Sequence, residues 1–127
     1  MTAQVTTRVS PRSVAATVSR LMEILSARGI KVFAVIDQSQ EARTAGLRLR
    51  ETTLVIFGNP AAGTPVMDAV PLAALDLPLK LLIWADGEQA NVSYVPPAAL
   101  AARYDLSAEL AAGLAGIGAI ADVLVAP

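Results

Sequence analysis

Gly58 and Gly63 are separated by four residues and follow an apolar run, a spacing close to that of a glycine loop that holds nucleotide phosphates. Such a loop needs a lysine directly after the second glycine and then Ser or Thr, so that the amine reaches the phosphates and the hydroxyl binds magnesium. In this chain Thr64 occupies the lysine position and Pro65 the hydroxyl position. Pro60 also removes one of the backbone N–H donors that would bind the anion. The sequence therefore argues against a nucleotide site in this segment.

The simpler interpretation of the same residues is the start of a helix. Asn59 followed by Pro60, or Thr64 followed by Pro65, matches an N-cap with proline in the first turn. Either pair predicts a short helix that runs toward Val70.

A strand expected over residues 79–86 carries the second candidate group. Side chains alternate between the two faces of a strand, so Lys80, Leu82 and Trp84 are predicted to lie opposite the core-facing residues. This face is consistent with the floor of a ligand cleft in which Lys80 meets an anion or a carbonyl group. The favoured alternative is a surface or dimer face, where Lys80 pairs with Asp76 and extends past apolar neighbours.

Tyr94, on the next strand, is expected to face the same side as Trp84, and two neighbouring rings are more typical of packing than of a cofactor site. An enzymatic role would use Lys80 as a base or Schiff-base former with Asp76 assisting, which requires a desolvated lysine with a lowered pKa. We rank this role last, because a lysine near a carboxylate is common in proteins. The aspartates show no spacing diagnostic of a carboxylate pair or a magnesium site.

The amino-acid counts exclude several chemistries. The chain has no cysteine and no histidine, which excludes disulfides, thiol nucleophiles, histidine-based triads, cysteine zinc sites and ordinary haem ligation. Any acid–base chemistry would use Asp, Glu, Lys or Tyr. We therefore expect no cofactor and no metal.

Charge and hydropathy restrict the partners. The chain has 10 basic and 11 acidic residues, with no run of like charge, so it lacks the basic face typical of nucleic-acid binding. Although 54% of the residues are hydrophobic, the longest uncharged apolar stretch near the end, residues 110–121, is shorter than the ~20 residues that span a bilayer. The first residues lack the apolar core of a signal peptide. We expect a cytoplasmic protein that binds neither nucleic acid nor a membrane.

The pattern of apolar residues predicts a single α+β domain over residues 1–127. An apolar stripe predicts a helix over residues 14–28, and Gly29 is placed to end it. The strand at residues 30–36 is apolar on both faces, so we expect it to be central or covered on both sides. Tight turns between the later strands, including one at Asp86-Gly87, favour a mostly antiparallel sheet packed by helices. Strands are expected at residues 3–9, 30–36, 53–57, 79–86 and 91–95.

Residues 107–125 are predicted to form one long helix that is apolar nearly all round. It contains Gly113, Gly116 and Gly118, and a glycine inside a helix costs about 1 kcal/mol relative to alanine. A helix that is apolar all round must be covered on more than one side. Two interpretations stay open: close packing within one chain, or a subunit interface on the second face of the helix.

Four segments resemble the bacterial and archaeal family known as domain of unknown function 302. They occur in the right order and cover nearly the whole chain: "GIKVFAVID", "AGLRLRETTLVIFGNPAAGTPVM", "LDLPLKLLIW" and "VSYVPPAALAARYDL". The resemblance implies a fold of strand, helix, four strands and helix, similar to the TATA-binding-protein-like or helix-grip architecture. It also suggests homodimers. It implies no activity, because the family is named for lacking one.

Three positions depart from the pattern of the family. Relatives often carry Asp-His where this chain has Asp37-Gln38, Lys where it has Ala61, and Asn-Asp-Pro where it has residues 95–97. A family site that used those groups would be weakened or lost here. The positions that match are Gly58, Asn59, Pro60, Gly63, Thr64, Pro65, Asp76, Leu77, Pro78, Lys80, Trp84 and Tyr94.

The leading hypothesis is a non-enzymatic binding module that holds a small or lipophilic ligand between the sheet and the long helix. The alternative is a homodimeric structural or interaction protein without a ligand, in which the last helix forms the contact. An enzyme that uses Lys80 with Asp76 is the third possibility. The ligand-binding residues expected from the sequence are Asn59, Thr64, Asp76, Lys80, Trp84 and Tyr94.

Overall fold

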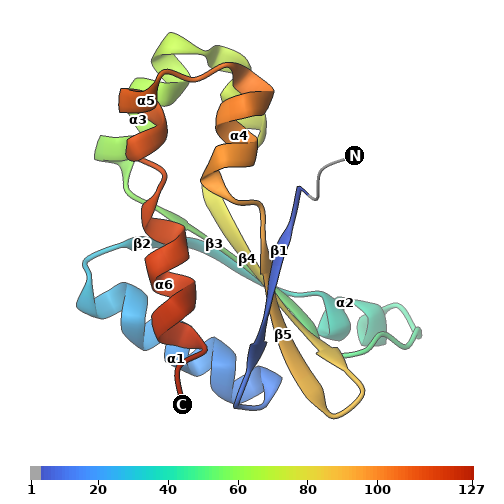
Figure 1. The fold of residues 1–127 in the computed structure, drawn as a ribbon. Helices are drawn as coiled ribbons and strands as arrows, with labels where there is room; N and C mark the ends of the chain where they lie inside the picture. The colour runs from blue at the N-terminus through green and yellow to red at the C-terminus, as the bar shows by residue number, and fades with distance from the viewer. Residues whose placement is uncertain (1–3) are drawn as a thin grey trace.

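The computed structural model describes residues 4–127 and shows a five-stranded sheet with helices on one face, a group of helices at one end and the short helix α2 (Gln38–Thr44) at the other (Figure 1). All neighbouring strands are antiparallel and follow the order β1-β5-β4-β3-β2. This confirms the mostly antiparallel α+β fold; Ala3, in the first predicted strand, lies outside the described residues. The strands are β1 (Thr6–Ser10), β2 (Lys31–Asp37), β3 (Thr52–Gly58), β4 (Leu79–Asp86) and β5 (Gln89–Tyr94).

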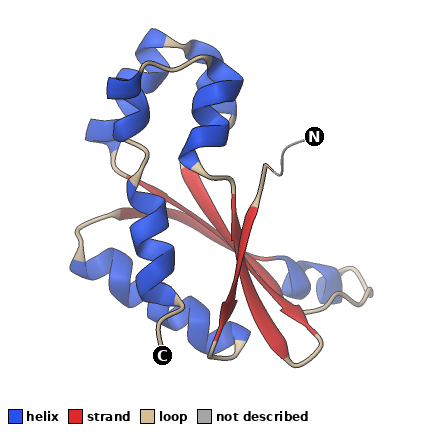
Figure 2. Cartoon of the chain, in the orientation of Figure 1, coloured by secondary structure: helices blue, strands red, loops and turns tan. Residues whose placement is uncertain are grey.

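The first helix, α1 (Val14–Ala27), links the two edge strands (Figure 2). The Ser13 hydroxyl accepts a hydrogen bond from a first-turn amide, as expected of an N-cap. Gly29 has a φ of 65° just beyond the helix, the left-handed conformation predicted for it. Apolar residues at helical spacing place Leu21 and Leu25 completely inside the core.

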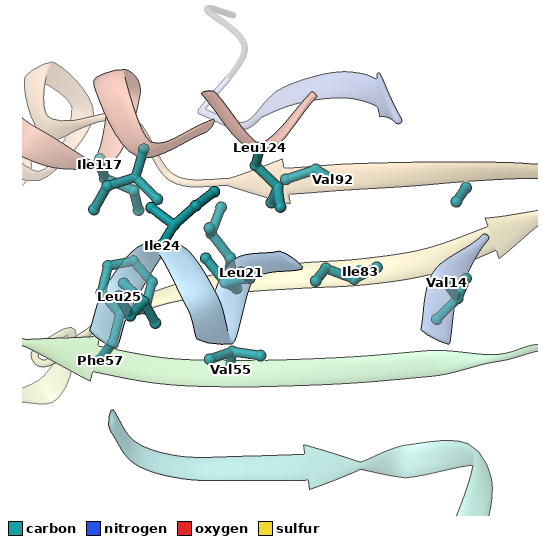
Figure 3. Packing of buried hydrophobic residues seen from close by; sticks show 13 residues of the cluster. Val14, Leu21, Ile24, Leu25, Val55, Phe57, Ile83, Val92, Ile117 and Leu124 are labelled. Carbon is teal, nitrogen blue, oxygen red and sulfur yellow. The ribbon is translucent and has the colours of Figure 1, made fainter. Parts of the chain in front are cut away.

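The main hydrophobic core, which we call the sheet core, lies between the sheet and the helices α1 and α6 (Gly116–Leu124). Figure 3 shows Leu124 of α6 beside Val92 of β5, and the side chains of α1 over β3 and β4. The buried members are Val14, Leu21, Ile24, Leu25, Val55, Phe57, Leu81, Ile83, Ala90, Val92, Ile117, Ile120 and Leu124.

A second and smaller cluster lies at one end of the sheet (Figure 1). We call this region, residues 60–75 and 97–114, the helical cap. Its helices are α3 (Pro60–Ala69), the 3-10 helix η1 (Pro71–Leu75), α4 (Pro97–Tyr104) and α5 (Ala108–Ala112). Its buried residues are Val66, Ala73, Leu100 and Leu114.

The prediction of one long helix over residues 107–125 is wrong, because this segment forms α5 and α6 with a turn between them. At Gly113 a Cβ would stand 3.5 Å from the backbone oxygen of Ala62 in α3, so the turn packs closely on the helical cap. The break lets α5 pack in the helical cap while α6 packs on the sheet. It also removes Gly113 from a helix interior, where glycine is costly.

The position predicted for the second strand is also wrong. β2 lies at the edge of the sheet, and its side chains alternate between half-buried and exposed. Phe33 is 45% exposed and Val35 is 47% exposed. The pairing with β3 shifts register between Val32 and Ala34, which is a bulge typical of edge strands. The apolar composition of β2 therefore reflects an exposed edge and not a central strand.

The face of the sheet opposite α1 and α6, which we call the open face, carries a row of aligned side chains. Register places Thr7, Ser93, Leu82, Leu54 and Ile36 side by side across the five strands. The three apolar members are half-buried and come from adjacent strands, so they form a continuous apolar strip.

Two short connections complete the fold. The helix α2 (Gln38–Thr44) joins β2 to β3. β4 and β5 form the predicted hairpin, in which Gly87 and Glu88 make the turn and Gly87 has a φ of 62°. No helix among residues 4–127 has both the length and the apolar character needed to cross a membrane.

Candidate functional site

An apolar pocket of about 130 Å³ lies where the helical cap meets the sheet. Phe57 of β3 and Leu79 of β4 form its sheet side, while Met67 of α3 and Ile117 of α6 form two of its helical walls. We call this cavity the apolar pocket. Its other lining residues are Ile30, Phe33, Gly58, Asn59, Pro60, Ala62, Gly63, Leu77, Pro78, Gly113, Leu114, Gly116 and Ile120.

The apolar pocket lies between two hydrophobic clusters and not inside one of them. Phe57 and Ile117 belong to the sheet core, Leu114 belongs to the helical cap, and Leu79 packs against both clusters. Protein interiors pack densely within one cluster. A space lined by residues of both clusters therefore lies at the boundary where the two are joined.

Asn59 is the N-cap of α3, one of the two alternatives predicted from the sequence. Its Oδ1 accepts the N–H of Ala61 at 3.0 Å, and its carbonyl oxygen accepts those of Ala62 and Gly63 at 2.9 Å. Pro60 has no N–H. The donors of the first turn are thus used within the chain, and this helix start has no free amide to bind a phosphate.

Lys80 is the second residue of β4 and is half-buried. Its Nζ donates hydrogen bonds to the carbonyl oxygens of Pro78 at 2.9 Å and Asp76 at 3.3 Å. Burial lowers the pKa of the Lys80 amine, and the charge of Asp76 partly opposes this shift. The predicted contact between Lys80 and Asp76 therefore exists, but it is made to the backbone of Asp76.

The Asp76 carboxylate binds two residues from the end of α4. The Tyr104 hydroxyl donates a hydrogen bond to Asp76 Oδ2, and Arg103 Nη1 lies 3.1 Å from the same oxygen. The hydrogen bond to Asp76, together with burial, raises the pKa of Tyr104, while Arg103 acts in the opposite direction. These contacts attach α4 to the segment that leads into β4.

A second cavity of about 70 Å³ adjoins Lys80, and we call it the Lys80 cavity. It shares Asp76, Val95 and Leu100 with a groove of about 500 Å³ that also runs along Arg103. The groove therefore adjoins the Lys80 cavity on the side of α4. Leu79 and Ile117 line both this cavity and the apolar pocket.

The sequence-predicted ligand residues do not form one site. Asn59 lines the apolar pocket, whereas Asp76 and Lys80 line the Lys80 cavity. Trp84 lies on the open face, where its Nε1 donates to Ser93 Oγ at 2.9 Å. The prediction that Tyr94 faces the same side as Trp84 is wrong. Ser93 is aligned with Leu82 of the open face, so Tyr94 points the other way and packs against the sheet core.

Thr64 is exposed on α3 and lines none of these three cavities. Sequence reasoning missed Met67, Arg103 and Tyr104, which line the apolar pocket or bind Asp76. No local spacing connects Tyr104 to Asp76, which lies 28 residues earlier. Within residues 4–127 no three acidic side chains gather as a metal site would require.

The family profile described as "Domain of unknown function DUF302" matches residues 5–123. The chain belongs to this family. A crystal structure of an uncharacterized conserved DUF302 protein from Bacillus stearothermophilus has a TM-score of 0.81 to this chain. The two are 18% identical, and the match covers 98% of this chain and 97% of that one. The resemblance inferred from the sequence is confirmed, and the structural likeness shows a common fold.

Curated relatives carry the name of an ion channel. This chain is 40% identical over 98 residues to "Fluoride-specific ion channel FluC 1" of Brucella suis biovar 1 (strain 1330), and equally similar to the protein of that name from Brucella abortus biovar 1 (strain 9-941). The match covers 76% of this chain but 39% and 36% of those proteins. The proteins that carry the channel name are therefore much longer than the segment that matches this chain.

The three departures from the family pattern have different structural settings. Gln38, which stands where relatives often carry histidine, is exposed at the first position of α2. The matching Asp37 caps this helix and accepts hydrogen bonds from the Ser39 hydroxyl at 2.6 Å and the Gln40 amide at 2.9 Å, which lower the pKa of Asp37. Ala61 is exposed in the first turn of α3 and lines none of the three cavities. Val95 lines the Lys80 cavity, so this departure is the one that alters a cavity.

Proposed function

We propose that the DUF302 domain of this chain is a non-enzymatic binding module that holds a small apolar molecule in the apolar pocket. The observation that carries the proposal is the boundary between the sheet core and the helical cap, where Phe57, Met67 and Ile117 line one cavity. Concave sites lined by apolar and aromatic side chains are the usual form of a small-molecule site. The sequence-based hypothesis placed the ligand between the sheet and the last helix, but of its six expected binding residues only Asn59 lines this pocket.

The volume of the apolar pocket limits the size of the ligand. An engineered apolar cavity of about 150 Å³ binds benzene or xenon, and this pocket has a volume of about 130 Å³. A single aromatic ring or a short branched alkyl group is therefore the expected scale. A larger ligand would have to extend past Phe33, which lines the pocket and is 45% exposed.

The lining also favours an uncharged ligand. The polar candidate in the wall, Asn59, uses its side-chain oxygen and its carbonyl oxygen to bind the amides of the first turn of α3. No charged side chain lines the pocket among the residues described. Burying a charge without a partner is costly, so an anionic or cationic ligand would be disfavoured.

Methionine methyl NMR tests this proposal directly with benzene as the probe. Met67 lines the apolar pocket, whereas Met22 packs against the sheet core outside it. Titration with benzene is expected to shift the Met67 methyl signal, because an aromatic ring in the pocket changes its magnetic environment. The Met22 signal should remain unchanged. A Met67 signal that does not move up to the solubility limit of benzene would contradict the proposal.

Gly116 offers a place for a larger side chain at the apolar pocket, because its Cβ position is unobstructed. A Cβ at Gly116 would meet nothing within 4 Å, and Gly116 lines the pocket. Gly116→Leu is expected to abolish the benzene-induced shift of Met67 while the chain stays folded. Gly118→Ala, in the same helix but outside the pocket lining, is the matched control and should leave the shift intact. Equal binding by both variants would exclude this pocket as the site.

We propose, as a second candidate, a homodimer that forms through the open face and not through the last helix. The sequence-based hypothesis placed the dimer contact on the last helix. We place it elsewhere, because α6 already buries Ile117, Ile120 and Leu124 within its own chain. The open face carries the apolar row with Leu54 and Leu82 at its centre. The homodimers suggested by the family resemblance agree with this use.

The hydrogen bonds of the open face support this second candidate. The indole N–H of Trp84 is bound by Ser93 Oγ, and the Ser93 hydroxyl lies 2.9 Å from the Thr7 hydroxyl. The indole N–H is therefore paired, and one of the two hydroxyl groups donates to the other, so covering this row would leave one hydroxyl hydrogen without a partner among these side chains. A contact with a second copy of the chain would therefore bury apolar side chains at the polar cost of one hydroxyl group.

Sedimentation velocity at micromolar concentration tests the dimer. Leu82→Glu places a charge at the centre of the open face and is expected to give a monomer. Leu75→Glu changes a leucine that is 77% exposed on η1 and should leave the dimer intact. A wild-type chain that sediments as a monomer would rule out this second candidate and leave the ligand proposal untouched.

A further inference from the structure

The Lys80 cavity combines an amine with apolar walls and does not depend on the apolar pocket. Lys80 lines it together with Leu79, Val95, Leu100 and Ile117, and Asp76 supplies a carboxylate at the same cavity. Its volume of about 70 Å³ corresponds to about five to seven times the space that one water-sized probe occupies. The cavity is thus large enough for a short alkyl chain next to the lysine nitrogen.

The hydrogen bonds of Lys80 leave its nitrogen available for reaction. A neutral amine has two N–H groups, and two carbonyl oxygens, of Pro78 and Asp76, accept hydrogen bonds from Nζ. The nitrogen lone pair then remains free. Burial lowers the pKa of the Lys80 amine, which increases the fraction of the nucleophilic neutral form.

We propose that Lys80 captures short-chain aldehydes as an imine inside the Lys80 cavity. The Nζ of Lys80 attacks the aldehyde carbon and forms a C–N bond. The resulting carbinolamine loses its hydroxyl group as water, and a C=N bond is formed. One amine and one aldehyde therefore give one imine and one water, with no oxidant or reductant involved.

Groups beside Lys80 offset the cost of burying the positive charge of a protonated imine. Its single N–H can donate to the carbonyl oxygen of Pro78 or Asp76, which now bind Nζ. The Asp76 carboxylate at the same cavity stabilises the positive charge. Leu100 and Ile117 shield the alkyl group and the C=N bond from water. Burial thus favours attack by the neutral amine, while the Asp76 carboxylate offsets part of the cost that burial imposes on the cationic product.

The chain provides its own control, because Lys31 and Lys80 are its two lysines. Lys31 is exposed at the start of β2 and lies over the ring of Phe33. Propanal with cyanoborohydride converts each imine into a stable propyl group. Digestion before aspartates gives the peptide 76–85, which contains Lys80 alone, so mass spectrometry reports its modification separately from Lys31 and from the N-terminal amine.

At limiting propanal, Lys80 is expected to be propylated several-fold faster than Lys31. Asp76→Asn keeps the backbone carbonyl but removes the charge of the side chain. Native mass spectrometry without reductant is expected to show less of the propanal imine at equilibrium in this variant than in the wild-type chain. Lys31→Arg should leave labelling of the peptide 76–85 unchanged. Labelling of Lys80 that is equal to or slower than that of Lys31 would overturn the proposal. An imine level unaffected by Asp76→Asn would overturn the role of the carboxylate.

Discussion

The sheet core contains many more buried residues than the core of the helical cap. Thirteen buried residues form the sheet core, and Leu21, Leu25 and Leu81 within it are fully inaccessible to solvent. Four buried residues form the core of the helical cap, which leaves Leu72 and Leu75 of η1 69% and 77% exposed. Segments with few buried apolar contacts open at lower free energy than the main core. The comparison indicates a stable sheet that carries a more easily opened cap.

The three cavities lie where the helical cap meets the sheet or the segment that leads into it. The cap therefore relies on contacts at this boundary, among them the N-cap at Asn59 and the bonds of Asp76 to Arg103 and Tyr104. A cap of low local stability can open without unfolding the sheet. Such opening would give a ligand a route to the apolar pocket. The following changes test this difference between the two regions.

Leu21→Ala is expected to have the largest effect, because it creates a cavity in the sheet core. The loss is about 2–5 kcal/mol in the free energy of unfolding. Urea denaturation followed by fluorescence of Trp84, the single tryptophan, measures the change. Leu75→Ala, at a residue that is 77% exposed, is the control and should change stability by less than about 0.5 kcal/mol. Similar losses in both variants would contradict the assignment of the core.

Leu100→Ala removes a buried leucine from the helical cap, where Leu100 is 6% exposed. Its local cost is expected toward the lower end of the range of about 2–5 kcal/mol, because the smaller cluster can relax around the change. Amide hydrogen exchange should accelerate in α3, α4 and α5, while β3 and β4 keep their protection. Equal acceleration in the sheet would show that the two regions unfold together.

Asn59→Ala tests the boundary itself. Loss of the N-cap is expected to cost about 1 kcal/mol, and faster hydrogen exchange should be confined to α3. Asn59→Asp keeps an oxygen that can accept the amide of Ala61 and should restore most of the protection. If the alanine variant exchanges like the wild type, the cap is held by packing alone.

Alkaline pH is expected to have the smallest effect, through the bond between Tyr104 and Asp76. The pKa of Tyr104 is raised in the folded chain above its ordinary value of 10.0, so folding favours the protonated phenol. Its contribution to stability is complete below that value and disappears as the pH rises through the raised pKa. Urea midpoints measured between neutral and alkaline pH should therefore fall more for the wild type than for Tyr104→Phe. If the urea midpoints of the two chains fall equally as the pH rises, the bond between Tyr104 and Asp76 does not contribute to stability.

Local features of the fold could be predicted from the sequence. Ser13 and Gly29 mark the ends of α1 as expected, and Asn59 was one of two N-caps considered for α3. The hairpin of β4 and β5 also followed from its turn residues. Each of these depends on residues that are neighbours along the chain, so their types and spacing were sufficient.

Features that depend on distant neighbours were not predictable in this way. Tyr94 was placed on the wrong face, because strand register and not sequence distance from Trp84 decides it. The break at Gly113 depends on the approach of α3, and the edge position of β2 depends on the strand order. Neither the helix break nor the edge position of β2 can be predicted from the pattern of neighbouring residues.

The sequence by itself determined the chemistry that the chain has available: two lysines, no histidine, no cysteine, and a glycine segment unsuited to phosphate. Tertiary structure alone decided where that chemistry lies. It joined Asp76 to Tyr104 across 28 residues and placed the apolar pocket between two clusters. The physical reason is that a cavity and a side-chain contact arise from surfaces brought together by packing, whereas capping and turn formation arise from the backbone conformation of adjacent residues.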